Sequence, residues 1–250
     1  MKYLKYSISA IVIYLVFIVV LLPANFVLSQ LELPKNIKLG MAQGTLWQGR
    51  VNTVQYGDLT INNVRWQLQA SALLLGKIEI DLVVGQPKDS IRGNGLLGYS
   101  FSGVSVEGLT LSAPVAELTK LAPLPYGLIA TGKVRLTVSD FSQGQPWCQS
   151  LSGKLKLTNS DISSGFGAIT VVTAQALLSC DNGDIVAVVN PETNSLGIDA
   201  KVVLDTKRNL IINGFVKPPS NASRDFVELL KFTGQPDTRG RYSLKFQQKI

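Results

Sequence analysis

Residues 132–138 read GKVRLTV and residues 153–158 read GKLKLT, and these two stretches decide the predicted fold. In each, a glycine is followed by strict alternation between charged or polar side chains and branched aliphatic ones. A strand places successive side chains on opposite faces of a sheet, so this period of two is typical of a strand with one buried face. A helix would instead need apolar residues three and four positions apart. We therefore expect a mainly β, mostly antiparallel fold.

The same alternation recurs along the chain. It predicts further strands at residues 51–56, 64–69, 77–82, 103–111, 169–178, 184–189, 201–204, 210–216 and 242–246. Most of the 22 glycines separate these stretches, as turn residues do. Five glycines stand directly before Lys or Arg and an apolar residue: Gly49, Gly76, Gly132, Gly153 and Gly240. We call this repeated pattern the glycine-basic word, and we interpret its glycine as the start of a strand with a positive φ or a bulge.

Two short segments break the strand pattern and predict helices. Residues 112–121 begin with Ser112, Ala113 and Pro114 and place an acid in the early turns. Residues 223–232 begin with Ser223 and are followed by Gly234. A capping serine at the start, an early proline and a glycine after the end are the usual limits of a helix. Each predicted helix precedes one of the glycine-basic strands, which suggests two related halves, about 28–142 and 148–250.

The N-terminus predicts a membrane anchor. Residues 6–31 contain no charged side chain, and residues 8–22 are almost wholly apolar. A helix needs roughly 20 apolar residues to cross the hydrocarbon of a bilayer. Lys2 and Lys5 precede this stretch, so the positive-inside rule predicts a cytoplasmic stub at 1–5, a transmembrane helix at 6–27 and an exported domain at 28–250. The alternative is a cleaved signal peptide, although its apolar region would be shorter.

Composition excludes most catalytic chemistry. The chain has no histidine and only two cysteines. This rules out His-based acid–base catalysis, Ser-His and Cys-His nucleophiles and the common zinc sites. The carboxylates occur singly, so no acid and nucleophile pair can be proposed. We therefore predict no catalytic, cofactor-binding or metal-binding residue, no cofactor and no enzymatic activity.

Three glycine-containing stretches are predicted to be turns rather than ligand sites. Residues 181–184 (Asp-Asn-Gly-Asp) resemble the start of a calcium loop but lack its ligand spacing, and they suit a hairpin. Residues 93–95 and 163–167 lack the strand-glycine-helix context of a phosphate loop.

Charge gives little indication of a polyanionic partner. The net charge is +7, and removing Lys2 and Lys5 leaves +5 on the exported part. The basic residues are scattered rather than gathered into a stripe, so we predict no nucleic-acid partner.

Cys148 and Cys180 lie in the exported part of the chain. An oxidising compartment makes a structural disulfide the default interpretation of a lone pair of cysteines. Free buried thiols remain open as an alternative. A redox-active pair is disfavoured because the two residues lack the close spacing of redox motifs.

The string Gly44-Thr45-Leu46-Trp47-Gln48-Gly49, shortly after a single N-terminal span, resembles type II secretion system protein N, also called general secretion pathway protein N. Further words follow in the same order. They are Trp66, Leu73-Leu74-Leu75-Gly76-Lys77, Trp147-Cys148, Leu151-Ser152-Gly153, Leu178-Ser179-Cys180 and Gly240-Arg241-Tyr242. The resemblance covers essentially the whole chain and offers no catalytic residues. We regard Gly44, Leu46, Trp47, Gly49, Trp66, Gly76, Trp147 and Gly153 as structural motif residues.

The resemblance implies a single-pass protein of the cell inner membrane whose bulk lies in the periplasm. It would be part of the machine that moves folded proteins from the periplasm across the outer membrane, with other type II secretion components and inner-membrane lipid as its partners. We hypothesise a non-catalytic interaction subunit, because a tether raises local concentration and strand edges offer contacts. The alternative is a periplasmic β-groove that binds or transfers lipid. An open apolar face, rather than a closed core, would favour that alternative.

Overall fold

The computed structural model describes residues 2–30, 34, 36–121, 129–164, 167–220, 222, 224–231 and 233–249. Within these residues the chain forms one sheet of fifteen strands and five helices. The helices are α1 (Lys2–Val20), α2 (Ala24–Gln30), α3 (Ala70–Leu73), α4 (Val115–Leu118) and α5 (Arg224–Lys231). The strands are β1 (Ile37–Leu39), β2 (Ala42–Gly44), β3 (Gln48–Tyr56), β4 (Leu59–Leu68), β5 (Ile78–Val84), β6 (Arg92–Ser100), β7 (Gly103–Pro114), β8 (Ile129–Ala130), β9 (Lys133–Gln143), β10 (Cys148–Ser164), β11 (Gly167–Asp181), β12 (Asp184–Asn194), β13 (Ile198–Leu204), β14 (Asn209–Val216) and β15 (Tyr242–Lys249).

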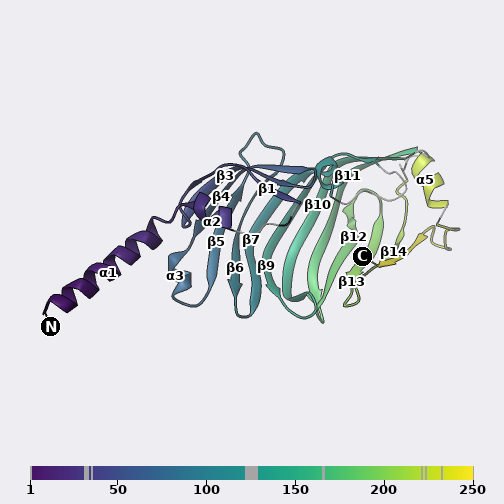
Figure 1. Cartoon of the computed structure of the whole chain (residues 1–250). Coiled ribbons are helices and arrows are strands. Elements are labelled where there is room, and N and C mark those ends of the chain that lie inside the picture. Colours follow the sequence, from purple (N-terminus) through teal and green to yellow (C-terminus); the bar gives the residue numbers. More distant parts are fainter. Residues whose placement is uncertain are drawn as a thin grey trace.

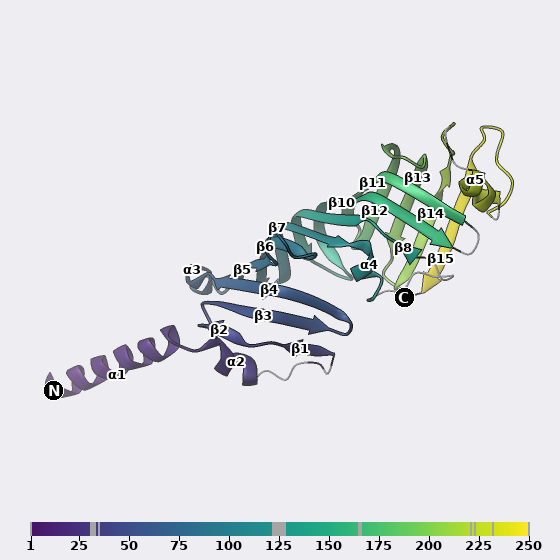
Figure 2. The ribbon, with the colours of Figure 1, turned by 90° about the horizontal axis from the view of Figure 1, so that it is seen from above.

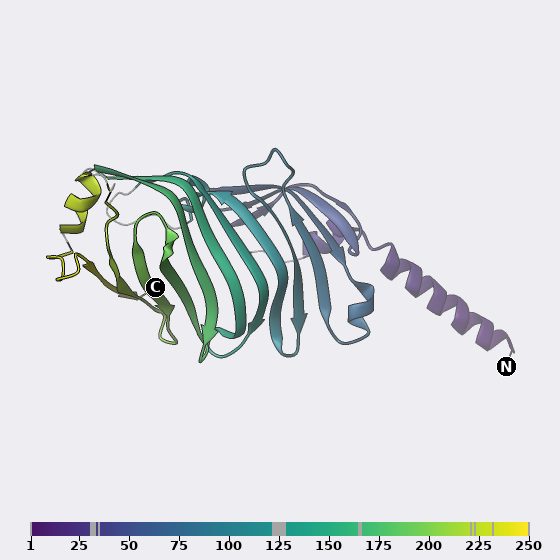
Figure 3. The same cartoon turned by 180° about the vertical axis from the view of Figure 1, so that it is seen from behind.

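The sheet is an antiparallel meander in which almost every strand pairs with its neighbours in sequence. The order runs from β1 and β3 through β4, β5, β6, β7 and β9 to β15, while β2 pairs with β3 and β8 pairs with β10. Figures 1 and 3 show the strands side by side in a long curled sheet, with α1 projecting from one end and α5 at the other. The prediction of a mainly β, antiparallel protein is confirmed.

The register places one continuous row of apolar residues across twelve strands. Directly opposed residues of antiparallel strands share a face of the sheet. The row consists of Val51, Val64, Val84, Gly93, Leu111, Leu136, Leu155, Ala176, Val189, Ala200, Gly214 and Leu244. We call the side that carries this row the apolar face.

The opposite side of the sheet is mostly polar. The sequence neighbours of the apolar row point to this side, and they form a second row of directly paired residues. This row consists of Arg50, Arg65, Val83, Asn94, Thr110, Thr137, Lys154, Leu177, Val188, Lys201, Asn213 and Lys245. The alternation in GKVRLTV and GKLKLT is therefore the alternation between these two faces.

The core is divided between small clusters rather than gathered in one centre. Near β4, the buried residues Leu59, Ile91 and Ala113 pack together with Leu118 of α4. At the far end, Phe226 and Leu230 of α5 are buried with Val216 and Tyr242, and other apolar side chains pack around them. The total accessible surface is 16754 Å² for a chain of 27.0 kDa, whereas a compact globular protein of this mass exposes about 10,800 Å². Part of this excess comes from α1, whose apolar side chains are exposed, and part comes from residues of the apolar face that no second layer covers, such as Leu155 at 38% exposure.

The predicted helices differ in outcome. The helix expected at residues 223–232 is present as α5, and its predicted capping residue Ser223 lies outside the described residues. The helix expected at 112–121 is reduced to the single turn α4. The prediction was wrong over residues 112–114 because they extend β7 and pair with β9, which places Ala113 in the core at 3% exposure.

The three predicted turns also have different outcomes in the structure. The hairpin at residues 181–184 is confirmed: Asp181 pairs with Asp184, and Asn182 and Gly183 have φ values of 51° and 88°. Positive φ at both central residues is what a type I′ hairpin turn requires. The turn expected at 93–95 was wrong, because these residues lie inside β6 opposite β5 and β7. A Cβ on Gly93 or Gly95 would press against the β7 backbone, so small residues serve close strand packing here. Gly165 and Phe166 of the third predicted turn lie outside the described residues.

The N-terminal region contains two helices. Helix α1 ends at Val20, and Pro23 forms an isolated bridge with Thr45 before α2 begins at Ala24. Residues 24–27, which we assigned to the anchor, thus belong to a separate helix. In the part of the chain that the structure describes, no helix is both long enough and apolar enough to cross a membrane. The suggestion of two related halves stays a prediction. The sheet itself runs on without a break where they would meet, because β9 pairs with β10.

Candidate functional site

The strongest candidate site is the apolar face, which is covered unevenly along its length. In the centre of the sheet, Leu155 is 38% exposed, and its row neighbours Leu136 and Ala176 are only partly buried. At the α1 end, helix α2 lies against the first strands, as Figure 2 shows from above. The face is therefore open in the middle and roofed at its beginning.

Helix α2 forms one wall of a half-open cavity of about 350 Å³ against the sheet. We call it the α2 cavity. Its lining residues are Ala24, Val27 and Leu28 of α2 with Leu39, Leu46, Val51, Val54, Val64, Trp66, Leu68, Ile80, Leu82 and Leu97. Residues 24, 27 and 28 lie on one side of a helix because they are three and four positions apart. No lining side chain is charged, and the indole N–H of Trp66 is already donated to the carbonyl oxygen of Leu46 at 3.0 Å.

The loop at residues 44–49 fastens helix α1 to the sheet, and we call this loop the clasp. The Trp47 indole Nε1 donates to the carbonyl oxygen of Val19 at 2.8 Å, close to the end of α1. The backbone N–H of Leu46 donates to the carbonyl oxygen of Leu22 at 2.9 Å. Together with the bridge between Pro23 and Thr45, these bonds hold the α1 to α2 connection against β3. The Val19 carbonyl oxygen also accepts the backbone N–H of Leu22 at 3.4 Å, so it takes one bond from the helix end and one from the clasp.

The clasp brings together five of the motif residues singled out in the sequence. Gly44 has a φ of 94°, which favours glycine, and it pairs with Gly49 across the turn. Gly49 lies opposite Trp66 on β4, and a Cβ at position 49 would collide with the Trp66 ring. Leu46 and Trp66 line the α2 cavity. Trp47 reaches the end of α1, so this motif joins the helix, the cavity and the sheet.

The remaining motif residues lie elsewhere. Gly76 precedes β5 with a φ of 71°, and Gly153 lies within β10 at a register shift rather than at a strand start. Gly132 and Gly240, with φ values of 101° and 71°, stand at the starts of β9 and β15 as expected for the glycine-basic word. Gly49 does not start a strand, because β3 begins at Gln48.

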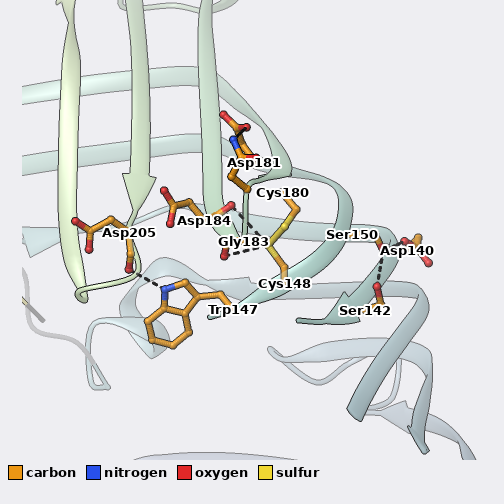
Figure 4. Close-up of a disulfide and its surroundings, with 11 residues drawn as sticks. Asp140, Ser142, Trp147, Cys148, Ser150, Cys180, Asp181, Gly183, Asp184 and Asp205 are labelled. Atoms are coloured by element: carbon orange, nitrogen blue, oxygen red, sulfur yellow. Dashed lines mark hydrogen bonds between the residues drawn. A yellow bond between two sulfur atoms is a disulfide. The ribbon is translucent and has the colours of Figure 1, made fainter. Parts of the chain in front are cut away.

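Trp147 and the cysteines form a second cluster near the ends of β10 to β13 (Figure 4). Cys148 and Cys180 form a disulfide with an S–S distance of 2.06 Å. The Cys148 Sγ lies 3.7 Å from the carbonyl oxygen of Gly183, a contact rather than a hydrogen bond because a disulfide sulfur carries no proton. The Trp147 indole Nε1 donates to the carbonyl oxygen of Asp205 at 2.8 Å. The β9–β10 connection is thereby tied to the ends of later strands.

The connection that leads into β15 has the most strongly shifted carboxyl. Hydrogen bonds from the backbone and side chain of Arg241 lower the pKa of Asp237 to about 2. The Arg241 Nε donates to Asp237 Oδ2 at 2.8 Å, and its guanidinium lies 4.5 Å from the centre of the Phe215 ring. This arrangement fixes the turn that leads into β15.

Two turns on one edge of the sheet carry exposed apolar side chains. Leu74 and Leu75, which follow α3, are 89% and 78% exposed. Phe101, in the turn between β6 and β7, is fully exposed. Position Gly76 lies close to Phe101, since a Cβ there would be 3.7 Å from its ring. We call Leu74, Leu75 and Phe101 the apolar edge, and Figures 1 and 3 place α3 on the side toward which α1 descends. Large exposed apolar patches usually mark an interaction surface.

In the described part of the chain, no His, Cys, Asp and Glu residues gather in groups of three or more that could hold a metal ion. The sequence analysis did not predict the α2 cavity. Pro23 is a local signal of a break before α2, because proline does not continue a helix, but the apolar residues at 24, 26, 27 and 28 do not reveal which side of α2 faces the sheet.

Comparison with known proteins gives one consistent result. Residues 35–245 match the family model described as "Type II secretion system (T2SS), protein N". The chain is 31% identical over 243 residues to type II secretion system protein N of Aeromonas hydrophila, covering 96% of each chain. It is 30% identical over 234 residues to the protein of that name from Vibrio cholerae, covering 93% of each, and 23% identical to that from Pectobacterium carotovorum, covering 98% of this chain and 96% of the relative. No solved structure matches the chain.

Proposed function

The chain belongs to the type II secretion system protein N family, and we propose that it acts as a non-catalytic, membrane-tethered subunit in the export of folded proteins from the periplasm across the outer membrane. The observation that carries this proposal is the family match, which spans almost the whole β domain. An extended sheet with long strands and free edges supports a role in contacts with other subunits.

Inner-membrane attachment through α1 is the next part of the proposal. The side chains of residues 11–21 are 44% to 65% exposed and almost all apolar. In the sequence, the uncharged stretch at residues 6–31 is longer than the roughly 20 residues that cross a bilayer, and it runs past the end of α1 at Val20. Lys2 and Lys5 precede the apolar run, which favours a cytoplasmic N-terminus and a periplasmic sheet.

The apolar edge supports the same placement. Leu74 and Leu75 directly follow α3, which Figure 1 places on the side toward which α1 descends, and Phe101 lies close to Gly76. These exposed side chains therefore suit the interface of the membrane that would hold α1. Burying a leucine side chain in an apolar environment is worth about 1.5–3 kcal/mol.

Deletion of the gene in its own host tests the secretion role. We expect proteins secreted by the type II system to accumulate in the periplasm, and expression of the wild-type chain to restore their export. Unchanged export in the deletion strain would refute the proposed role.

A second candidate function, lipid binding or transfer, is favoured by the apolar face. A continuous row of apolar residues over twelve strands, partly uncovered in its centre, is the open arrangement that distinguishes a groove from a closed core. Native mass spectrometry of the purified chain tests it. Co-purified phospholipid is expected, and its complete absence would argue against this function.

A further inference from the structure

We propose that the α2 cavity binds one acyl chain of a phospholipid drawn from the membrane in which α1 resides. This inference rests on the second candidate function and on the proposed placement of α1. It adds where on the apolar face a lipid is held and which part of the lipid is recognised.

The chemistry of the lining selects hydrocarbon. The thirteen lining residues carry no charge, and the one polar hydrogen among their side chains, that of Trp66, is already bonded to Leu46. A polar ligand would lose its hydrogen bonds to water and gain none here, at a cost of several kcal/mol per group. A peptide segment is disfavoured for the same reason, because each of its backbone N–H and C=O groups needs a partner.

The dimensions fit a single chain. The cavity of about 350 Å³ lies at the lower end of the range for small-molecule sites, roughly 300–1,000 Å³. Its floor extends over β3, β4, β5 and β6, which is three strand spacings or about 14 Å. One leaflet of a bilayer contributes about half of its roughly 30 Å of hydrocarbon, so an extended acyl chain has nearly the length of this floor.

The position of the cavity points to the membrane as the source. The roof helix α2 begins four residues after α1 ends, and the clasp bonds to Val19 and Leu22 at the end of α1. Leu46 belongs to both the clasp and the cavity lining. A chain leaving the outer leaflet beside α1 therefore reaches this cavity before any other part of the apolar face. The face beyond β6 continues the same apolar row toward α5, whose Phe226 and Leu230 cover the far end.

The test uses the full chain in nanodiscs that contain phosphatidylglycerol with a photoactivatable diazirine near the end of one acyl chain. Cross-linked peptides are mapped by mass spectrometry. We expect cross-links within residues 24–28 and 64–68 in addition to those on α1. Cross-links confined to α1 would overturn the inference.

Two cavity-filling variants and one control give a second readout. Val64→Phe and Leu82→Phe place a larger side chain inside the α2 cavity, while Leu136→Phe makes the same kind of change on the same face in the middle of the sheet. We expect cross-links to residues 24–28 to fall at least five-fold in the two cavity variants and to stay near the wild-type level in the control.

The possible results distinguish lipid binding somewhere on the apolar face from acyl-chain binding in the α2 cavity. Cross-links on the apolar face that are lost only with Leu136→Phe would leave lipid binding standing and overturn the cavity assignment. No cross-link anywhere on the sheet of the wild-type chain would overturn both. If a cavity variant fails to fold, as judged by circular dichroism, the cross-link map of the wild-type chain decides alone.

Discussion

Breaking the disulfide between Cys148 and Cys180 should destabilise the fold by a calculable amount. The bridge spans a sequence separation of 32, and this loop contains β10 and β11, the two longest strands of the sheet. Closing a loop of this size in the unfolded chain corresponds to about 3.7 kcal/mol at 25 °C in the chain-entropy description. Reduction should therefore lower the equilibrium constant for folding by roughly 500-fold.

Urea unfolding of the full chain in detergent micelles, followed by tryptophan fluorescence, measures this effect. Comparing the oxidised with the reduced wild-type chain removes no atoms from the buried site, where Cys148 is 2% exposed. The midpoint should fall on reduction and the dependence on urea should steepen, because the reduced unfolded chain exposes more surface. The variant Cys148→Ala/Cys180→Ala should resemble the reduced protein and be insensitive to reductant. A loss below about 1 kcal/mol, or an equal response of the double variant to reductant, would refute the reasoning.

Three further predictions test the clasp, the apolar edge and the turn before β15. Trp47→Phe removes the indole N–H that is donated to Val19 and should weaken the attachment of α1 to the sheet by about 1 kcal/mol. The expected result is faster amide exchange at residues 20–24. The control Trp147→Phe should leave amide exchange in this segment unchanged. Contact of the apolar edge with lipid should make amide exchange at residues 73–76 slower in nanodiscs than in a lipid-free amphiphilic polymer. The double variant Leu74→Ser/Leu75→Ser should abolish this difference. Equal exchange rates in the wild-type chain would contradict the proposed placement of the apolar edge at the membrane. The pKa of Asp237 is lowered to about 2 from 3.8. The stabilising contribution of its carboxylate should therefore be fully present above pH 4 and be lost as the pH falls through about 2. A carboxyl titration by NMR with a midpoint near 4 would contradict the hydrogen bonds with Arg241.

Much of the sheet was predictable because one side of it is polar. Alternation is visible in residues 133–138 and 154–158, where charged side chains face solvent and aliphatic ones lie on the apolar face. Strand β6 was missed because its sequence, RGNGLLGYS, is rich in glycine, and glycine is more often a turn residue than a strand residue. The pairing partners that require small residues at positions 93 and 95 are distant in sequence or set by register, so no local pattern reveals them.

The start of α4 was also mispredicted because long-range strand pairing leaves no local sequence pattern. Ser112, Ala113 and Pro114 have the composition of a helix start, yet tertiary pairing with β9 extends the strand through them. Local preferences amount to a few tenths of a kcal/mol per residue, whereas cross-strand pairing and burial of Ala113 act together.

The candidate site was predictable only in part. The words around Trp47 and Trp66 were singled out by their resemblance to a family, and the structure shows that they meet at the end of α1. The disulfide was predicted from the expected exported compartment and the lone pair of cysteines, and it is present. The α2 cavity depends on where the chain turns after Val20, which hydropathy along residues 6–27 does not indicate because both helices there are apolar.

The sequential order of the strands has a consequence for how the molecule is made. Each new strand needs little more than the strand synthesised just before it, so contacts close over short distances and assembly can advance in one direction along the chain. The first strands are held by the clasp beside α1, and they offer an edge to the next segment of the chain as soon as it is free to pair. Such a template would let the sheet grow outward hairpin by hairpin, and a family with this architecture can lengthen or shorten its reach by gaining or losing a hairpin without rearranging the rest.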